Sequence, residues 1–484
     1  MAIEKNLLEE DSPDYEPAIA RWATNAQRNA KVVVFVKDSE DIVIAIKYAK
    51  ENGLPVAVKG GGHNAAGASS VEDGLVIDLS RYLNQVRIEP DKRLGYVGGG
   101  CVWKTVDEAA IKYGLATVGG TVNHILKVGW LRRPAWGGGG YGWLTNRYGL
   151  ATDNIRQATV VTADGSILTA NDKDNEDLFW AIRGGGGNFG VVTEFVFELY
   201  PQRKTVFAGT IVYAPDSLKE IIEVTQRWWP NAGENEAMCQ VATVDPESRN
   251  VSAAFRGRKS AGIDHPSKPV FVLLVMYNGS EEEGRAAYKE FLDIGPIADM
   301  AKELPYEELN TLQNVQSARG QGWYLKGISQ KAPDFEGAMK VLMGAGGLSQ
   351  NQKFFPSIIW EYFPLSKVNA VPVSATAFRR ELTPNILFTI AWGGPKDRTS
   401  EARTAVQNMV DILIAGQRGL SKSEEFGYTN YDTEATPAQV RNTAGSVDRA
   451  KLAFGSNYPK LQQVKKKYDP ESVFNRWFPI IPAA

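Results

Sequence analysis

The stretch PVAVKGGGHNAAG, residues 55–67, joins a short apolar run to three glycines and a histidine. Apolar residues followed by glycines are typical of a buried strand that runs into a tight loop. Because glycines let backbone N–H groups converge on one point, such a loop can form a nest for a phosphate or pyrophosphate group. His63, one of three histidines in the chain, lies at the edge of this nest. The alternative is a glycine turn with a solvent-exposed histidine, and the loop alone does not separate the two.

Further glycine clusters follow at residues 98–101, 119–120, 137–142 and 184–190. Short β-prone runs lie close to them in the sequence. So many glycine loops in one half of the chain indicate a large ligand that lies against exposed backbone, and a dinucleotide is the natural candidate. The G-x-G-x-x-G sequence between a first strand and a helix is missing, which argues against a Rossmann nicotinamide site.

Length and composition limit the classes of protein to consider. A chain of 484 residues predicts more than one domain. A net charge of −2 argues against a nucleic-acid partner. No stretch reads as a membrane span, and the first residues lack the features of a secretory signal, so we expect a cytoplasmic protein. Cys101 and Cys239 are expected to be buried thiols, His265 a loop residue, and no Cys/His spacing predicts a metal site.

Several long motifs, in order along nearly the whole chain, carry a resemblance to a known family. They are VKGGGHNAAGASSVEDGLVIDLSRYLNQV, VGGGCVW, GLATVGGTVNH, GGGYGWLTNRYGLATDNI, DLFWAIRGGGGNFGVVTEF and the terminal NYPKLQQVKKKYDPESVFNRWFPI. The chain resembles the berberine-bridge-enzyme-like FAD-linked oxidases of the vanillyl-alcohol oxidase and p-cresol methylhydroxylase superfamily. The resemblance implies bound FAD, and His63 matches the histidine that the family joins to the 8α-methyl group of the flavin.

The resemblance also implies a fold and a set of cofactor-binding positions. We expect an α+β protein with a two-subdomain FAD-binding domain of the p-cresol methylhydroxylase type, residues 1–201. A substrate domain with an antiparallel sheet covered by helices would span 202–434, and a segment returning to the FAD domain 435–484. With His63, the positions expected to bind FAD are Lys59, Gly60, Gly61, Gly62, Asn64, Gly67, Gly120, Thr121, His124, Gly139, Gly140, Tyr141, Gly142, Asp153, Asn154, Gly187, Gly190, Val191, Val192 and Asn475. A simple core role is the alternative for His124.

Residues 123–136 depart from the family pattern, because two tryptophans and two arginines replace small residues. Relatives with a second flavin link carry a cysteine in this segment. This chain has none there, and Val122 is nearest in register. The prediction is therefore a single covalent link through His63. Arg132 and Arg133 are either partners of the pyrophosphate or part of a displaced surface loop.

Local patterns predict several individual elements. Residues 270–277, 357–362 and 385–392 are expected to be strands. A helix is expected to open at Asp38–Asp41, with Ile42, Ile44, Ala45 and Tyr48 on its apolar face, and residues 280–292 are expected to form one capped amphipathic helix. Aromatic residues of the second domain are candidates either for a substrate pocket or for the core: Trp360, Tyr362, Phe378 and Trp392.

Oxidation by a flavin moves a hydride to N5, while a nearby group takes the proton of an O–H or N–H bond. Tyr431 matches a tyrosine motif of the family, and Glu361 lies on the strand that supplies an acidic residue in some carbohydrate-oxidising relatives. Either residue is a candidate base; the alternatives are a tyrosine packed against the flavin ring and a salt-bridged carboxylate. Ala65 stands where plant relatives place a tyrosine, which argues against an alkaloid-cyclising reaction.

The predicted function is an FAD-dependent oxidase of a small secondary metabolite, an alcohol, an amine or an activated C–H compound, with dioxygen as electron acceptor and hydrogen peroxide as product. A carbohydrate oxidase is the first alternative. The second alternative is a flavin-scaffolded cyclase or a non-redox binding protein.

Overall fold

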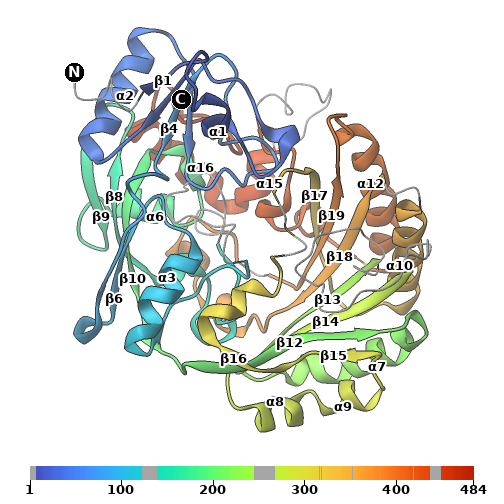
Figure 1. Cartoon of the computed structure of the whole chain (residues 1–484). Coiled ribbons are helices and arrows are strands. Elements are labelled where there is room, and N and C mark those ends of the chain that lie inside the picture. The colour runs from blue at the N-terminus through green and yellow to red at the C-terminus, as the bar shows by residue number, and fades with distance from the viewer. Residues whose placement is uncertain are drawn as a thin grey trace.

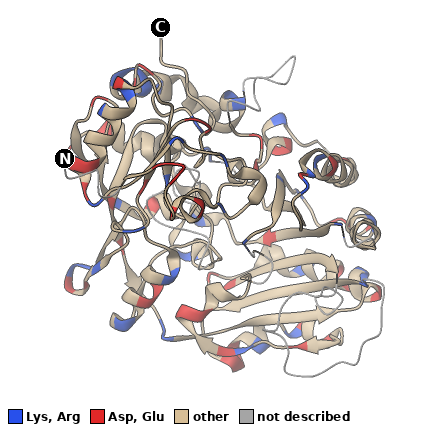
Figure 2. Cartoon of the chain, turned by 45° about the horizontal axis from the view of Figure 1, so that its top comes forward, with Lys and Arg blue, Asp and Glu red and all other residues tan. Residues whose placement is uncertain are grey.

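The structure is a computed structural model that describes residues 7–122, 139–244, 268–314, 317, 319–350, 353–380, 382–417, 419–436 and 449–484. Within these residues the chain builds three sheets of four or more strands (Figure 1). Two of the sheets lie before residue 201, and the third lies after it. Lysine and arginine are interspersed with aspartate and glutamate along the ribbon (Figure 2).

The first sheet presents the loop that carries His63. In the order β1-β2-β4-β3 its strands are β1 Leu7–Leu8, β2 Val32–Phe35, β4 Leu75–Asp78 and β3 Val56–Lys59. β2, β4 and β3 run parallel to one another. Because β3 ends at Lys59, the glycine loop begins at the carboxyl end of a parallel strand, next to the end of β4.

Helix α2, Ser39–Glu51, connects β2 to β3 and packs on the first sheet. The sequence prediction of its apolar face was wrong at two positions, because Ile44 is 42% exposed and Tyr48 is 37% exposed. The helix buries a different stripe, since residues three, four and seven positions apart share one side of a helix. That stripe consists of Ile42, Ala45, Ile46 and Ala49.

The second sheet is antiparallel and completes the first domain. In the order β5-β6-β10-β8-β9 its strands are β5 Val86–Glu89, β6 Leu94–Gly98, β10 Val191–Glu198, β8 Ile155–Val161 and β9 Ile167–Asn171. Helix α3, Trp103–Ala110, contacts β5, and helix α6, Glu176–Ile182, contacts β9. The aromatic and aliphatic side chains of α3, α6 and β10 share one continuous core.

The third sheet forms the part of the chain that we expect to be the substrate domain. In the order β15-β12-β14-β13-β18-β19-β17, with β16 beside β12, its strands are β12 Thr205–Tyr213, β13 Glu236–Val244, β14 Pro269–Tyr277, β15 Ala298–Asp299, β16 Lys302–Pro305, β17 Gly322–Ser329, β18 Phe355–Tyr362 and β19 Asn385–Trp392. All of these pairings are antiparallel. The three strands predicted from the sequence correspond to β14, β18 and β19, so that prediction is confirmed.

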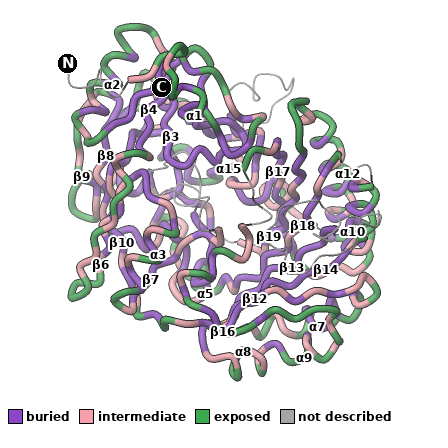
Figure 3. The backbone as a smooth tube through the Cα atoms, in the orientation of Figure 1, coloured by how far each residue is buried: buried purple, intermediate pink, exposed green. Residues whose placement is uncertain are grey.

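The two faces of the third sheet have different environments. The outer face packs against helices α7 Leu218–Trp228, α8 Glu281–Ala287, α9 Lys289–Asp293, α10 Phe335–Ser349 and α12 Thr399–Gly416 (Figures 1 and 3). Trp360, Tyr362 and Trp392 belong to the core under these helices, so for them the core alternative holds. The inner face joins the core that includes the first domain. This arrangement is the predicted antiparallel sheet covered by helices.

The expected single helix over 280–292 is two helices, α8 and α9, separated at Tyr288. The predicted cap is present, as a capping box formed by Ser280 and Glu283. Tyr288 has φ −100° and ψ 15°, and its side chain is fully buried. Its hydroxyl donates to the carbonyl of Met276 at 2.7 Å. The helix breaks because this side chain inserts under the sheet instead of following the helical path.

The C-terminal segment lies against the first domain. Helix α16, Tyr458–Tyr468, contacts α6. Lys465 is buried and donates through Nζ to the carbonyl of Asn188 at 2.6 Å and to Oδ2 of Asp469 at 2.6 Å. These contacts agree with a segment that returns to the FAD-binding part, although the boundaries at 201/202 and 434/435 stay a prediction.

The remaining elements are short. They are α1 Tyr15–Ile19, α5 Thr145–Tyr148, α11 Ser366–Ala370, α13 Lys422–Phe426, α15 Arg449–Phe454, β7 Leu115–Ala116 and β11 Tyr200–Pro201. Cys101 and Cys239 are buried thiols, as predicted. Among the helices that the structure describes, none combines the length and the apolar character needed to cross a bilayer.

Asp107 on α3 is a buried carboxyl group at the contact with the 3-10 turn Tyr306–Thr311. It accepts a hydrogen bond from Nδ2 of Asn310 at 2.8 Å. Burial raises the pKa of Asp107 to about 7. Oδ1 of Asn310 has no hydrogen-bond partner among the described residues. It can therefore accept a hydrogen bond from the O–H of protonated Asp107, or from the side-chain N–H of an asparagine at that position.

We expect Asp107→Asn to remove a pH dependence of stability. The folded state holds the proton of Asp107 up to about pH 7, whereas an unfolded aspartate releases it near pH 4. The contribution of the neutral carboxyl group to the free energy of unfolding is therefore complete below pH 4. It falls by about 1.4 kcal/mol per pH unit as the pH rises towards 7. Urea unfolding at pH 5, 6, 7 and 8 measures this slope. Glu223→Gln, on the exposed side of α7, is the control and should keep the wild-type slope; equal slopes in both variants would contradict the assignment.

Candidate active site

His63 lies in the loop after β3 and is buried, with 1% of its surface exposed. Gly62 has φ +70° and Gly67 has φ +80°, conformations that glycine adopts without strain. The carbonyl of Gly62 accepts a hydrogen bond from the backbone N–H of Trp22 at 2.8 Å. A Cβ atom at Gly67 would lie 3.3 Å from the carbonyl oxygen of Ala26. The glycines therefore let the loop pack closely against residues 20–26, and the solvent-exposed turn considered for this histidine is not what forms.

Arg319 contacts His63 directly, and the sequence analysis missed it. Its Nη2 atom lies 2.9 Å from Nε2 of His63 and donates to the carbonyl of Gly61 at 3.4 Å. Burial lowers the pKa of Arg319, although other atoms of the residue remain exposed. The two side chains are 256 positions apart, and no motif surrounds Arg319, so only the fold relates them.

Lys59, a predicted cofactor-binding residue, forms a buried ion pair in which Nζ lies 2.6 Å from Oδ2 of Asp78. Arg21 is 4% exposed, and its guanidinium donates to the backbone carbonyls of residues 18, 19, 20 and 69. Burial lowers the pKa of Arg21 to about 10. Burial also lowers the pKa of Lys59, with Asp78 opposing that change. Around His63, these groups and Arg319 amount to three cations and one carboxylate.

The residues of this region fit the dinucleotide that the sequence predicts. Four buried hydroxyl groups have no hydrogen-bond partner among the described residues, namely those of Ser69, Ser70, Thr117 and Tyr141. Because buried polar groups are nearly always paired, such hydroxyls indicate a ligand with matching polar groups. Gly142 has no space for a side chain, since a Cβ atom would lie 1.6 Å from the carbonyl oxygen of Gly119. Bare backbone and unpaired hydroxyls together suit phosphate and ribose groups.

Two predicted cofactor-binding residues make their contacts within the protein. Oδ1 of Asp153 lies 2.5 Å from Nη2 of the buried Arg380. Asn154 donates through Nδ2 to the carbonyl of Leu150 at 2.7 Å and accepts from the hydroxyl of Tyr200 at 2.7 Å. These contacts give both residues a part in holding the segment after Gly149.

The other predicted positions lie in glycine loops or at strand ends. Those that are buried are Gly60, Gly61, Asn64, Gly120, Gly139, Gly140, Gly187, Gly190, Val191 and Val192. Thr121 and Asn475 are half-buried, and Arg476, next to Asn475, donates to the carbonyl of Ser70 at 2.8 Å. The C-terminal segment thus reaches the loop of His63. His124, Arg132, Arg133 and His265 lie outside the described residues.

The two candidate bases lie together. Glu361 is on β18, and Tyr431 is in the 3-10 turn Thr429–Tyr431. The Tyr431 hydroxyl donates to Oε1 of Glu361 at 2.5 Å, and Nδ2 of Asn385 donates to Oε2 at 3.3 Å. Cys239 on β13 and Asn385 on β19 flank Glu361 across the sheet. The sequence named both candidates, and the structure brings them into one hydrogen-bonded pair.

Glu361 and Tyr431 differ in how the surroundings shift their pKa values. Burial raises the pKa of Glu361 to about 7, while the hydrogen bonds from Tyr431 and Asn385 hold it down. Burial and then the charge of Glu361 raise the pKa of Tyr431 well above its usual value. At neutral pH Glu361 can therefore take up a proton, whereas Tyr431 keeps its own.

Two further tyrosines connect this pair to the glycine loops of the first domain. The ring of Tyr428 lies 5.0 Å from the ring of Tyr431 and 4.8 Å from the ring of Tyr141. The Tyr428 hydroxyl accepts from the backbone N–H of Gly140 at 2.9 Å. Burial and the charge of Glu361 raise the pKa of Tyr141. Tyr141, predicted only as a cofactor residue, therefore lies close to the Glu361 pair as well.

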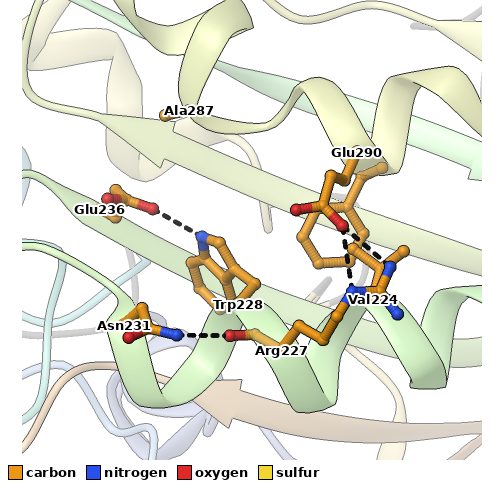
Figure 4. Close-up of a pocket in the computed structure, with 8 residues that line it drawn as sticks. Val224, Arg227, Trp228, Asn231, Glu236, Ala287 and Glu290 are labelled. Carbon is orange, nitrogen blue, oxygen red and sulfur yellow. Dashed lines mark hydrogen bonds and ion pairs between the residues drawn. The ribbon is translucent and has the colours of Figure 1, made fainter.

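A hollow of about 240 Å³ lies elsewhere, on the helix-covered side of the third sheet. Its walls include Trp228, Glu236 and the ion-paired Arg227 and Glu290 (Figure 4). Trp228 packs against Tyr362, which points away from the face that carries Glu361. None of the predicted site residues lines this hollow, so we do not assign it to the chemistry.

Comparisons with known proteins agree with this geometry. Residues 30–171 match the family described as "FAD binding domain", and residues 427–479 match "Berberine and berberine like". The chain is 31% identical to the FAD-linked oxidoreductase pgmH of Aspergillus terreus, over 99% of this chain and 93% of the relative.

Solved structures confirm the predicted α+β fold with an FAD-binding domain of the p-cresol methylhydroxylase type. The 6-hydroxy-D-nicotine oxidase of Arthrobacter nicotinovorans matches with a TM-score of 0.81 at 23% identity, over 99% of this chain and 98% of that one. The glucooligosaccharide oxidase of Acremonium strictum, described as carrying a 6-S-cysteinyl, 8α-N1-histidyl FAD, matches with a TM-score of 0.80 at 21% identity, over 100% and 98%. The chain belongs to the berberine-bridge-enzyme-like FAD-linked oxidoreductases, and it is an enzyme that uses FAD.

Proposed function

We propose that this enzyme oxidises a small, largely apolar metabolite that bears an O–H or N–H group, passes the electrons to dioxygen and releases hydrogen peroxide. The observation that carries the proposal is the buried hydrogen-bonded pair of Glu361 and Tyr431. A carboxyl group with a pKa near 7, next to a polar partner that orients it, is suited to proton abstraction at neutral pH.

The residues of the first domain hold the cofactor in this proposal. The glycine loops after β3 and before β10 supply backbone N–H groups, and Ser69 and Ser70 supply hydroxyls. When bound, FAD accepts a hydride from the substrate at N5. His63 attaches the cofactor covalently, through Nδ1, because Arg319 already occupies Nε2. The histidyl link of the Acremonium strictum oxidase supports this assignment by analogy.

Glu361 takes the proton that the substrate's O–H or N–H group releases. Tyr431 keeps its own proton at neutral pH, because burial and the neighbouring carboxylate raise its pKa. The proton therefore reaches Oε1 of Glu361 either directly or through Tyr431, whose oxygen accepts it while its O–H proton passes on to Oε1. Asn385 fixes the other carboxylate oxygen, so the group keeps one orientation throughout.

The inner face of the third sheet favours an apolar substrate. Two residues along β18 from Glu361, a row of residues crosses the sheet. In this row Val241 pairs with Ile359, Ile359 with Leu387, and Leu387 with Gly327. Further along, the Thr243 and Ser357 hydroxyls bond to one another at 3.1 Å. An oligosaccharide requires many polar partners, whereas this row offers none, so a hydroxylated aromatic compound or an N-heterocycle suits it better. Anaerobic flavin bleaching with such compounds and with cello-, xylo- and chito-oligosaccharides tests the choice.

We expect the wild-type protein to stay yellow after acid precipitation and His63→Ala to give a colourless pellet. In the attachment one N–H bond of the imidazole and one C–H bond of the flavin 8α-methyl group break and one C–N bond forms, and the two protons and two electrons released reduce one dioxygen to hydrogen peroxide. Flavin fluorescence of the denatured protein on a gel provides the measurement. His265→Ala, at a histidine that none of the family motifs includes, is the matched control and should keep the covalent flavin. A flavin that washes out of the wild-type protein in acid would contradict the link.

We expect the rate of flavin reduction to rise with pH and level off about one unit above pH 7, because the base must be ionised to act. Glu361→Gln should lower the rate by roughly 10²-fold to 10⁴-fold, the usual contribution of a general base. Tyr431→Phe should move the inflection to higher pH, since the lost hydrogen bond lowers the pKa of Glu361 in the wild type. Stopped-flow reduction with the best substrate of the panel measures both. Glu401→Gln, on the exposed side of α12, is the control; an unshifted profile in Tyr431→Phe would rule out the coupling.

A further inference from the structure

The surroundings of His63 carry an excess of positive charge. Lys59 and Asp78 neutralise each other in a buried pair, and the second oxygen of Asp78 accepts from the backbone N–H of Ser80 at 2.7 Å. Arg21 is bound to backbone carbonyls and has no carboxylate in the contacts that the structure describes. Arg319, from the loop before β17, adds a further cation at the imidazole itself. A proton on His63 would therefore be repelled from several sides.

The contact between Arg319 and His63 also selects the form of the imidazole. A guanidinium has N–H donors and no acceptor, so it can only donate at 2.9 Å. Nε2 of His63 must then carry a lone pair, and the proton of the neutral ring lies on Nδ1, from which it leaves when the C–N bond to the flavin forms. In an imidazolium ion both ring nitrogens carry protons, and the hydrogen bond to Arg319 would be lost. The observed geometry is thus compatible with the neutral imidazole alone.

Arg319 is held in place by the same residue that fixes the histidine loop. Trp22 donates through its backbone N–H to Gly62, and its indole Nε1 donates to the carbonyl of Ser317 at 2.7 Å. The backbone N–H of Gly320 donates to the carbonyl of Trp22 at 3.3 Å. The indole of Trp22 stacks on Trp323 at 4.5 Å, with an angle of 18° between the ring planes. Both ends of the Arg319 contact are therefore anchored on one tryptophan, which makes the contact a built feature of the fold.

We propose that Arg319 is a positioning residue that keeps His63 neutral and oriented for attachment of the flavin, so that attachment proceeds in mildly acidic as well as neutral solution. The inference rests on the covalent link proposed above. Arg319 acts through His63, by occupying Nε2 and opposing its protonation. Among the described residues, the other charged groups that face the loop are Arg21 on the segment after α1, Lys59 on β3, Asp78 on β4 and Arg476 of the C-terminal segment. Three of these four are cations and act in the same direction as Arg319.

The protonation of His63 can be followed without any turnover. The chain has three histidines, so protein labelled with [¹³Cε1]-histidine gives three ring signals, and His124→Gln and His265→Gln assign the third to His63. In wild-type protein prepared without flavin, in which Nδ1 is not yet alkylated, we expect the His63 signal to stay in the neutral form well below the ordinary histidine midpoint of about pH 6.5. Arg319→Met should raise its midpoint by about one pH unit or more. Arg319→Lys keeps the charge and should stay close to the wild type.

The control for removal of a cation is Arg28→Met. Within the described residues, Arg28 donates to the carbonyls of Asn25 and Gln27, and it belongs to the same segment as Trp22. We expect it to leave the His63 midpoint unchanged. A wild-type midpoint near 6.5, or equal midpoints in the wild type and Arg319→Met, would overturn the proposal.

Attachment of the flavin gives a second, independent measurement. Apoprotein of each variant is incubated with FAD at pH 6 and at pH 8.5, and the acid-stable flavin is quantified. Arg319→Met should attach the flavin several-fold more slowly than the wild type at pH 6 and recover at pH 8.5, where the imidazole is neutral without help. A defect equal at both pH values would show a structural role and contradict the proposal. If the wild type itself attaches no flavin while the His63 midpoint behaves as expected, the covalent link fails and the effect of Arg319 on protonation stands.

Discussion

The hydrogen bond between Glu361 and Tyr431 is the interaction on which the proposed chemistry depends. A buried carboxylate is costly unless it has partners, and here one phenol and one amide offset part of that cost. The balance leaves the pKa of Glu361 near 7, so neither the protonated nor the ionised form is strongly favoured at neutral pH. With more burial the group would stay protonated, and with more partners it would be too weak a base. The environment is therefore tuned by a small number of contacts around a single side chain.

Those contacts rest on close backbone packing between β17 and the segment that carries Tyr431. A Cβ atom at Gly327 would lie 3.0 Å from Cβ of Tyr431, and one at Gly427 would lie 2.5 Å from the carbonyl carbon of Gly327. Gly427 also has φ +72°, which suits glycine. Two glycines thus face each other where the tyrosine turn meets the sheet. Because both positions are glycine, no side chain holds the tyrosine turn away from the sheet, and the phenol of Tyr431 reaches the carboxyl group of Glu361 on β18.

The sequence was sufficient for the features that a local pattern encodes. The glycine loop, His63, β14, β18 and β19, and the candidates Glu361 and Tyr431 all follow from short motifs or from resemblance. The pairing of Glu361 with Tyr431 does not, because 70 positions separate them and register across the sheet decides the contact. Arg319 was missed for the same reason, and its neighbours in the sequence are unremarkable. The aromatic candidates show a further limit: alternation along β18 turns Glu361 inwards and Tyr362 outwards, and composition alone does not reveal which face of a strand is which.

Strand β17 relates the two chemical centres to one another. At its start, Trp323 stacks on Trp22, and the loop before it delivers Arg319 to His63. Four residues further on, Gly327 receives Tyr431. At about 3.3 Å per residue this separates the two contacts by roughly 13 Å along an extended backbone. β17 is the edge strand of the third sheet, and it pairs with β19 from Gly322–Trp392 through Ser329–Asn385. Because this pairing holds β17 extended, it fixes the spacing between the end that packs on Trp22, next to the loop of Arg319, and the glycine that receives Tyr431.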